Sequence, residues 1–403
     1  MFALRRKRWK MVKLSKFVTQ VRGVSYKPND VILEKKAGYT CLLRANNIHG
    51  GELQFDDVVY VDSARVKNTQ LLRAGDILIC ASSGSRHLVG KAACVTGDIN
   101  VTFGAFCKVI RPLAEYAPFL GWFFKSPRYR MQISNASAGV NINNIRAEDI
   151  DNMEIDLCTV KQREEAVRKL NAITHLISLR QRQAEKLDEL VKARFVEMFG
   201  DPVLNYLHIE ACPMTEICQI IDGDRGKNYP KAEDFFDKGD CLFLNAKNVT
   251  KAGFNFDECM FITKDKDNVL RKGKLQRGDI ILTTRGTIGN LALYTDDVPY
   301  SDIRINSGMV ILRMNREYIN PIYFIEQFKM QLENIKRKIA SGTAQPQLPI
   351  STMNKIKVII PEIRLQANFA NFVHEVDREK ERIQRSAALL EALKRSLMQQ
   401  YFG

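Results

Sequence analysis

The fold is decided by the stretch QRQAEKLDELVKARFVEMFG, residues 181–200, because it returns near the end of the chain as QRSAALLEALKRSLMQQYFG, residues 384–403. The two stretches are identical at seven of twenty positions without a gap, at an offset of 203 residues. A fixed offset of this kind indicates one folding unit that occurs twice. The chain of 403 residues is therefore predicted to contain two copies of roughly 200 residues each.

Matches upstream of these stretches extend the repeat over most of the chain. The sequence Gly-Asp-Ile-Leu at residues 75–78 falls on Gly-Asp-Ile-Ile at residues 278–281, again 203 positions later. Further upstream the offset shrinks, since Leu43 and Asn47 match Leu244 and Asn248 at 201. Small insertions in surface loops explain that drift.

Each copy begins with a block that alternates short strand-like and helix-like patterns. Short apolar runs bounded by Gly, Asn and Asp predict strands at residues 58–61, 77–81, 92–95, 241–244, 280–284, 291–294 and 309–312. Helical patterns lie between them, at residues 118–125 and 321–338. The mixture predicts a compact α+β domain in each copy, with the domains at residues 1–160 and 201–362.

Each copy ends in a predicted long helix, at residues 161–200 and 363–403. Residues 162–199 and 364–402 contain neither Gly nor Pro. Apolar residues recur there at steps of four and three, from Ala166 to Met198 and from Phe369 to Tyr401, which is typical of a coiled-coil seam. We expect the helices to bury these seams against each other as an antiparallel pair with pseudo-two-fold symmetry. The alternative is that each helix packs on its own domain.

Composition and charge restrict the partners and the compartment. Lys and Arg number 61 against 46 Asp and Glu, which gives a net charge of +15 and favours a polyanion such as nucleic acid. No apolar run approaches the roughly 20 residues of a membrane span, and no secretory signal pattern is present. The nine cysteines include no C-x-x-C pair. We therefore expect a reduced, cytoplasmic protein without a metal site.

Motifs for catalysis are absent or defective. The segment at residues 84–91 is similar to a phosphate-binding loop, but it is one residue too long and Ala92 follows its lysine. The segment at residues 297–300 reads Asp-Val-Pro-Tyr and only approximates the D-P-P-Y motif of adenine methyltransferases. A methyltransferase or nuclease in its own right and a helical scaffold that does not bind DNA remain as alternative functions.

Basic and amide-bearing residues recur at equivalent loops of the two copies. Arg, Asn and Gln side chains can read base edges, and Lys holds phosphate. Some of these residues could instead cap turns, and Arg86 and Arg285 are the strongest candidates for groove contacts. The candidate DNA-binding residues are Arg44, Asn46, Asn47, Ser85, Arg86, His87, Lys91, Asn141, Arg225, Lys227, Asn245, Lys247, Arg285, Thr287, Asn290 and Gln345.

Together these features resemble the specificity (S) subunits of type I restriction–modification systems. The resemblance rests on the two Gly-Asp-Ile strands, on the Gly-Thr-Ala-Gln-Pro-Gln-Leu stretch at residues 342–348, on the helix start from Pro361 to Gln366, and on the two long helices. The first copy departs from the pattern, with Gly139-Val140-Asn141 in place of G-T-x-Q and Cys158 in place of the proline.

The resemblance implies a non-catalytic, sequence-specific DNA-binding subunit. Each domain would be a target recognition domain that reads one half of a bipartite site in double-stranded DNA. The helices would set the spacer and dock two modification subunits, which carry S-adenosylmethionine and methylate adenine. Restriction subunits driven by ATP would complete the nuclease. No cofactor is expected in this chain, because S-adenosylmethionine, ATP and Mg²⁺ would belong to the partner subunits.

Overall fold

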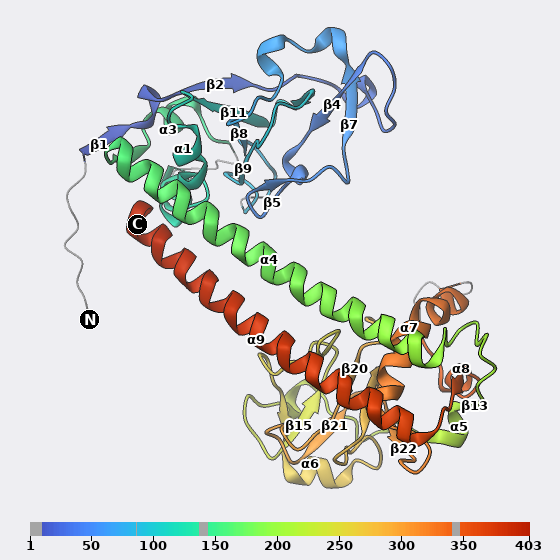
Figure 1. Ribbon diagram of the computed structural model, residues 1–403. Coiled ribbons are helices and arrows are strands. Elements are labelled where there is room, and N and C mark those ends of the chain that lie inside the picture. The colour runs from blue at the N-terminus through green and yellow to red at the C-terminus, as the bar shows by residue number, and fades with distance from the viewer. Residues whose placement is uncertain (1–9, 86, 137–143, 341–346) are drawn as a thin grey trace. The chain divides into compact units, whose positions relative to one another are not determined.

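The computed structural model describes residues 10–85, 87–136, 144–340 and 347–403. The chain divides into two units, of which unit 1 comprises Met1–Arg180 with Arg385–Gly403, and unit 2 comprises Gln181–Gln384. Both units combine helices and sheets (Figure 1), so the predicted α+β class is confirmed. The division passes through both long helices, so each unit contains part of each helix. The domain limits expected from the sequence treat each helix as a separate segment.

Unit 1 contains two four-stranded sheets and two short strand pairs. Its strands are β1 (Lys10–Lys13), β2 (Val18–Arg22), β3 (Val31–Ile32), β4 (Tyr39–Leu43), β5 (Ile48–His49), β6 (Glu52–Leu53), β7 (Val59–Asp62), β8 (Ile77–Cys80), β9 (Ala92–Cys94), β10 (Val101–Phe103), β11 (Cys107–Pro112) and β12 (Glu154–Leu157). The sheet orders are β2-β11-β8-β9 and β10-β4-β7-β3, and the pairs are β1-β12 and β5-β6. Only β10 and β4 pair in parallel among these strands.

Helices α1 (Ala117–Phe123), α2 (Pro127–Ala136) and α3 (Ala147–Asp151) of unit 1 lie near the start of α4 (Val160–Phe199) (Figure 1). Their apolar side chains share one core with alternate residues of β8, such as Ile77 and Ile79. The opposite face of β8, with Leu78, packs into a second core with Phe103 and Val109. Because both faces of β8 are covered, its four residues are all buried.

Unit 2 repeats this order of elements. Its strands are β13 (Ala211–Pro213), β14 (Cys218–Asp222), β15 (Cys241–Leu244), β16 (Val249–Thr250), β17 (Gly253–Phe254), β18 (Phe261–Ile262), β19 (Ile280–Thr283), β20 (Leu291–Leu293), β21 (Ile303–Ile305), β22 (Met309–Met314) and β23 (Lys357–Ile359). The orders are β14-β22-β19-β20 and β18-β15-β21, with pairs β13-β23 and β16-β17. Unit 2 also contains helices α5 (Met214–Ile217), α6 (Lys264–Val269), α7 (Pro321–Ala340) and α8 (Ile350–Met353), the end of α4, and the first part of α9 (Ile363–Phe402).

The repeated Gly-Asp pair forms the turn that leads into the central strand of each unit. Gly75 has a φ of 85°, a left-handed conformation that favours glycine. The buried Asp76 accepts a hydrogen bond from the Arg73 backbone N–H at 2.9 Å. Arg111 on β11 donates to both carboxylate oxygens of Asp76 at 2.7 Å each. In unit 2 the same bonds are made by Gly278, Asp279, Gln276 and Arg313, so the motif is structural.

The two long helices pack together with the globular part of each unit. In unit 1 the end of α9 joins the core, where the Phe402 ring lies 4.9 Å from that of Phe119, and Ala166 on the start of α4 belongs to the same cluster. In unit 2 the end of α4 packs near the start of α9, where the Phe195 and Phe369 rings lie 5.4 Å apart. Within each unit the start of one helix thus accompanies the end of the other, which is an antiparallel arrangement.

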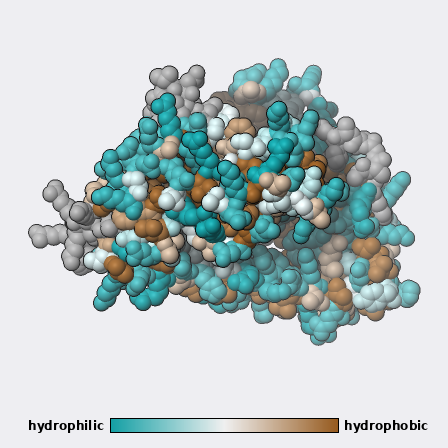
Figure 2. Space-filling view, turned by 90° about the horizontal axis from the view of Figure 1, so that it is seen from above, coloured by the Kyte–Doolittle hydropathy of each residue, from teal (hydrophilic) through white to brown (hydrophobic). Residues whose placement is uncertain are grey.

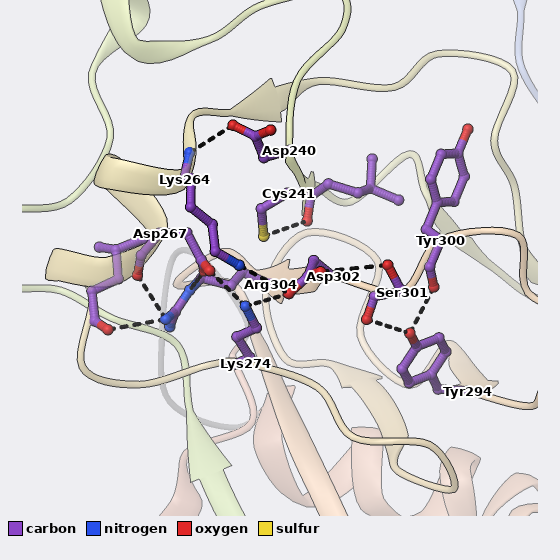
Figure 3. A network of polar contacts seen from close by, with 12 residues as sticks. Asp240, Cys241, Lys264, Asp267, Lys274, Tyr294, Tyr300, Ser301, Asp302 and Arg304 are labelled. Atoms are coloured by element: carbon purple, nitrogen blue, oxygen red, sulfur yellow. Dashed lines mark hydrogen bonds and ion pairs between the residues drawn. The ribbon is translucent and has the colours of Figure 1, made fainter.

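A buried network of charged side chains ties α6 to β21 in unit 2 (Figure 3). Arg304 forms an ion pair with Asp267 through its Nε atom and donates to the Asp267 and Leu270 carbonyls. Lys274 bridges the carboxylates of Asp267 and Asp302 at 2.5 and 2.6 Å. The equivalent of Arg304 in unit 1 is Thr102, which donates to the Gln70 carbonyl at 2.9 Å. The charged network is therefore specific to the second copy.

The surface shows no broad apolar area on the face drawn in Figure 2, where hydrophobic residues are scattered among hydrophilic ones. Scattered exposed apolar side chains are normal on globular proteins. Of the helices in the described part of the chain, none is long and apolar enough to cross a membrane.

Candidate nucleic-acid interface

The loop after β4 is built around Asn47. Its side chain is 1% exposed, accepts from the Arg44 backbone N–H at 2.8 Å, and donates to the carbonyls of Gln54 and Asp57 at 3.0 and 2.9 Å. All its polar atoms are therefore used inside the loop. Asn47 is among the DNA-binding candidates expected from the sequence, with turn formation as the alternative role. In the structure its side chain forms the turn.

The loop after β15 in unit 2 repeats this arrangement bond for bond. Asn248 accepts from the Asn245 backbone N–H at 2.9 Å and donates to the carbonyls of Asn255 and Glu258 at 3.0 and 2.8 Å. It is buried like Asn47. All four positions lie 201 residues after their counterparts, so the repeat extends to individual hydrogen bonds.

The side chains that these loops present to solvent are paired with acidic groups. In unit 1 Arg44 and Asn46 donate to the two carboxylate oxygens of Asp57 at 2.9 and 2.5 Å. In unit 2 Lys247 and Glu258 form an exposed ion pair at 2.6 Å. Exposed pairs contribute little free energy, so a phosphate or base can replace the carboxylate as a partner. The Nε atom of Arg44 is buried and has no partner among the described residues.

A pocket of about 600 Å³ in unit 1 brings the β4 loop next to the loop after β8. Arg44 and Asn46 face it from the first loop. Burial raises the pKa of Tyr26 in its wall, so that hydroxyl stays protonated. Burial also raises the pKa of Cys107 to about 12, which keeps the thiol protonated and non-nucleophilic. The pocket is lined by Tyr26, Arg44, Ala45, Asn46, Ser82, Ser83, Gly84, Leu88, Gly104, Phe106 and Cys107.

A smaller pocket of about 250 Å³ in unit 2 contains two of the predicted arginines. Arg285 donates from Nε to the side-chain oxygen of Gln347 at 3.1 Å, and its backbone bridges to Gln347 as well. Among the described residues its two Nη groups have no hydrogen-bond partner. Arg225 is held by Asp222 at 3.1 Å and by the Ser307 carbonyl at 3.3 Å. Asp222 lines the same pocket and offsets the charge of Arg225, so the two guanidinium groups leave one net positive charge there.

Backbone bonds establish which residue of unit 1 is equivalent to Arg285. In unit 2, Arg285 forms an isolated antiparallel bridge with Gln347, and in unit 1, Ser82 forms the same bridge with Asn144. Both pairs differ by 203 positions. Arg285 therefore corresponds to Ser82, which is not among the DNA-binding candidates expected from the sequence.

Comparison with known proteins agrees with this geometry. Residues 209–391 match the family model described as type I restriction modification DNA specificity domain. The EcoKI specificity subunit of Escherichia coli is 35% identical over 185 residues, which cover 46% of this chain and 40% of that subunit. The MjaVIII specificity subunit of Methanocaldococcus jannaschii is 20% identical over 406 residues, which cover 94% of this chain and 90% of the relative.

The matched segment, residues 209–391, lies within the second copy of the repeat and resembles the DNA specificity domain of type I restriction–modification systems. The match to the EcoKI subunit spans less than half of that relative's length. The crystal structure of a type I restriction–modification S subunit from M. genitalium superposes with a TM-score of 0.54 at 15% identity, over 100% of this chain and 98% of that one. At that identity the superposition shows that the fold is shared.

The other candidate residues that the structure describes line neither the pocket around Arg44 nor the pocket around Arg285. Ser85, His87, Lys227 and Thr287 are exposed. Asn290 donates its side-chain amide to the Val249 carbonyl at 2.9 Å, which commits that group to the fold. Arg86, Asn141 and Gln345 lie outside the described residues.

Lys91 lines a separate pocket of about 250 Å³ in unit 1. Lys125 and Arg130 line the same pocket, together with the glycines of the β5–β6 turn, Gly50 and Gly51. Three cations around one hollow favour a phosphate partner. The structure therefore separates Lys91 from Arg44 and Asn46, which line the larger pocket.

Sequence reasoning missed several residues that line the pockets around Arg44 and Arg285. Tyr26, Ser82 and Phe106 reach the pocket of unit 1 from three different segments, and Gln347 reaches that of unit 2. Serine and phenylalanine carry no charge signal in a sequence. A position-by-position alignment of the two copies at the offset of 203 would have paired Ser82 with Arg285 and identified Ser82 as a candidate.

Proposed function

We propose that this chain is the non-catalytic, sequence-reading subunit of a type I restriction–modification complex. Each globular domain reads one half of a bipartite site in double-stranded DNA. The observation that carries the proposal is that the equivalent strands β8 and β19 each lead into a pocket, which Ser82 lines in unit 1 and its equivalent Arg285 lines in unit 2.

The chemistry of these pockets suits a DNA groove. Arg285 and Arg225 supply donors that match guanine or phosphate, and Asn46 supplies an amide that can face adenine. The net charge of +15 adds the sequence-independent attraction that such proteins use to associate with DNA. The two pockets share one equivalent position, which is Ser82 in unit 1 and Arg285 in unit 2, and present different side chains there, as expected for two domains that read different sequences on one scaffold.

We propose that catalysis and cofactors belong to other subunits. We propose that two modification subunits dock on the long helices and carry S-adenosylmethionine for adenine methylation. Restriction subunits, which use ATP and Mg²⁺, add cleavage. The complex acts in the cytoplasm, where bacterial DNA lies. This chain determines the DNA sequence to which the complex binds and the distance between the half-sites.

Exchanging one domain tests the assignment. Residues 201–360 are replaced by the equivalent part of another specificity subunit, and the chain is co-expressed with its modification subunits. Single-molecule sequencing then reads the methylated adenines of the host genome. We expect one half of the methylated motif to change while the other half and the spacer stay the same.

The reciprocal exchange of residues 11–160 is the matched control and is expected to change the opposite half. A change in both halves after either exchange, or in neither, contradicts independent reading by two domains. Methylation by the purified chain alone, abolished by substituting one of its own residues, would contradict a non-catalytic role.

A further inference from the structure

At one pair of adjacent positions, the two domains carry their large and small side chains in opposite order. In unit 1 the Phe106 carbonyl accepts from the backbone N–H groups of Ala81 and Ser82 at 2.9 and 3.0 Å. In unit 2 the Gly308 carbonyl accepts from those of Thr284 and Arg285 at 2.8 and 3.2 Å. The backbone positions are therefore equivalent. One domain presents Ser82 with Phe106, and the other presents Arg285 with Gly308.

The side chains of these two positions project next to each other. A Cβ atom built on Gly308 would lie 3.8 Å from the Cβ atom of Arg285, which is van der Waals contact. Each domain has one large and one small residue here, and the large one comes from the opposite strand end in the two cases. Because the two positions are adjacent, the large side chain of each domain starts from nearly the same part of the scaffold, and it lines a pocket in each case, through Phe106 in unit 1 and Arg285 in unit 2.

Phe106 is 66% exposed although it is a large aromatic residue. It lines the 600 Å³ pocket, whose surface is mostly apolar, together with the hydrogen-bonding side chains of Ser82, Ser83 and Asn46. Leu113, at the other end of β11, is 51% exposed and lines none of the described pockets. It provides a matched exposed apolar residue outside the pocket.

We propose that this paired position selects one base in each half-site, and that Phe106 selects thymine through its C5-methyl group. The inference rests on the proposed DNA-reading function. Arg285 donates to the acceptors that guanine presents in the major groove, and an apolar side chain at the same place contacts the methyl group by which thymine differs from cytosine there. The two domains thus use one scaffold position with opposite chemistry.

Deoxyuridine tests this directly, because it removes only the methyl group. The intact complex with its modification subunits is bound to duplexes in which each thymine of the cognate site is replaced in turn by deoxyuridine. We expect one position of the first half-site to lose roughly threefold to tenfold in affinity, the order expected for burial of one methyl group. The Phe106→Ala variant is expected to lose this sensitivity, and Phe106→Leu to keep it.

Two further variants sharpen the test. Leu113→Ala should bind all duplexes as the parent does. The double variant Ser82→Arg with Phe106→Gly builds the side chains of unit 2 into unit 1 and is expected to shift the preference at that one position from thymine to guanine, with the other positions unchanged.

The inference is overturned if no thymine of the first half-site is methyl-sensitive, or if Phe106→Ala keeps the sensitivity of the parent. It is also overturned if Phe106→Ala weakens binding equally for all sequences, since a ring that wedges between base pairs or merely packs on sugar would act that way. Failure of the proposed function looks different: the parent complex would then show no preference for any sequence.

Discussion

Replacing Asp267 by alanine is expected to destabilise unit 2 by about 3–5 kcal/mol, the cost of breaking a buried ion pair by removing one partner. The side chains of Asp267 and Arg304 are 3% and 7% exposed. Without the carboxylate, Arg304 remains buried with its charge uncompensated, and Lys274 loses one of its two partners. Hydrogen bonds from Arg304 to the Lys272 and Leu270 carbonyls hold the guanidinium in place, so it cannot turn to water.

Calorimetry of the full chain measures the effect. For a unit of this size 1 kcal/mol corresponds to about 2–4 °C, so the transition of unit 2 should fall by roughly 6–20 °C. Fluorescence of Trp122, which lies in unit 1, provides an internal comparison and should change much less. The control is Asp296→Ala, because Asp296 is 98% exposed and 3.9 Å from Arg277, and its loss should cost almost nothing.

The destabilisation should also depend on pH. Burial raises the pKa of Asp267, but hydrogen bonds from Lys274 and Arg304 outweigh it and leave that pKa below its ordinary value. A carboxyl whose pKa is lowered by folding stabilises the fold above its unfolded pKa of about 3.9, and this contribution is lost as the pH falls through the folded pKa. The difference between the parent and Asp267→Asn should therefore be full at neutral pH and shrink below about pH 4.

Two results would refute this reasoning. If Asp267→Ala and Asp296→Ala had the same small effect, the buried network would not stabilise unit 2. If the combined variant Asp267→Ala with Arg304→Met cost as much as the sum of the two single changes, the two side chains would not interact, because a true pair loses its interaction only once.

The remaining predictions concern recognition, spacing and the Gly-Asp turn. Arg285→Ala should weaken binding to the cognate site by about 1–3 kcal/mol and relax one base position of the second half-site; an equal loss on all sequences, with a shallower salt dependence, would make Arg285 a phosphate contact. Adding seven residues to both long helices, in the first within 181–191, should lengthen the spacer by roughly 10 Å and leave the half-sites unchanged, which sequencing of methylated adenines reads. Gly75→Ala should lower stability by about 1–2 kcal/mol in thermal unfolding because of its positive φ, whereas Gly84→Ala, with no atom near its added Cβ, should be neutral.

Local patterns in the sequence determined the elements and their repetition. The seven predicted strand stretches all coincide with strands, and the helix expected from residue 161 begins at Val160. Such elements follow from periodicity, because alternation and heptad spacing are properties of neighbouring residues. Less patterned strands such as β10 and β11 escaped prediction, although β11 carries the arginine that holds Asp76.

Only the tertiary structure decided which residues meet at the candidate interface. The bridges to Asn144 and Gln347 match Arg285 with Ser82, a residue that is not among the candidates expected from the sequence. Likewise Asn46 and Asn47 look alike in sequence, yet Asn46 reaches the pocket and Asn47 is buried. The physical reason is that side-chain partners depend on strand register and loop closure, which join segments 20 to 100 residues apart, whereas sequence pattern records only what neighbouring residues share.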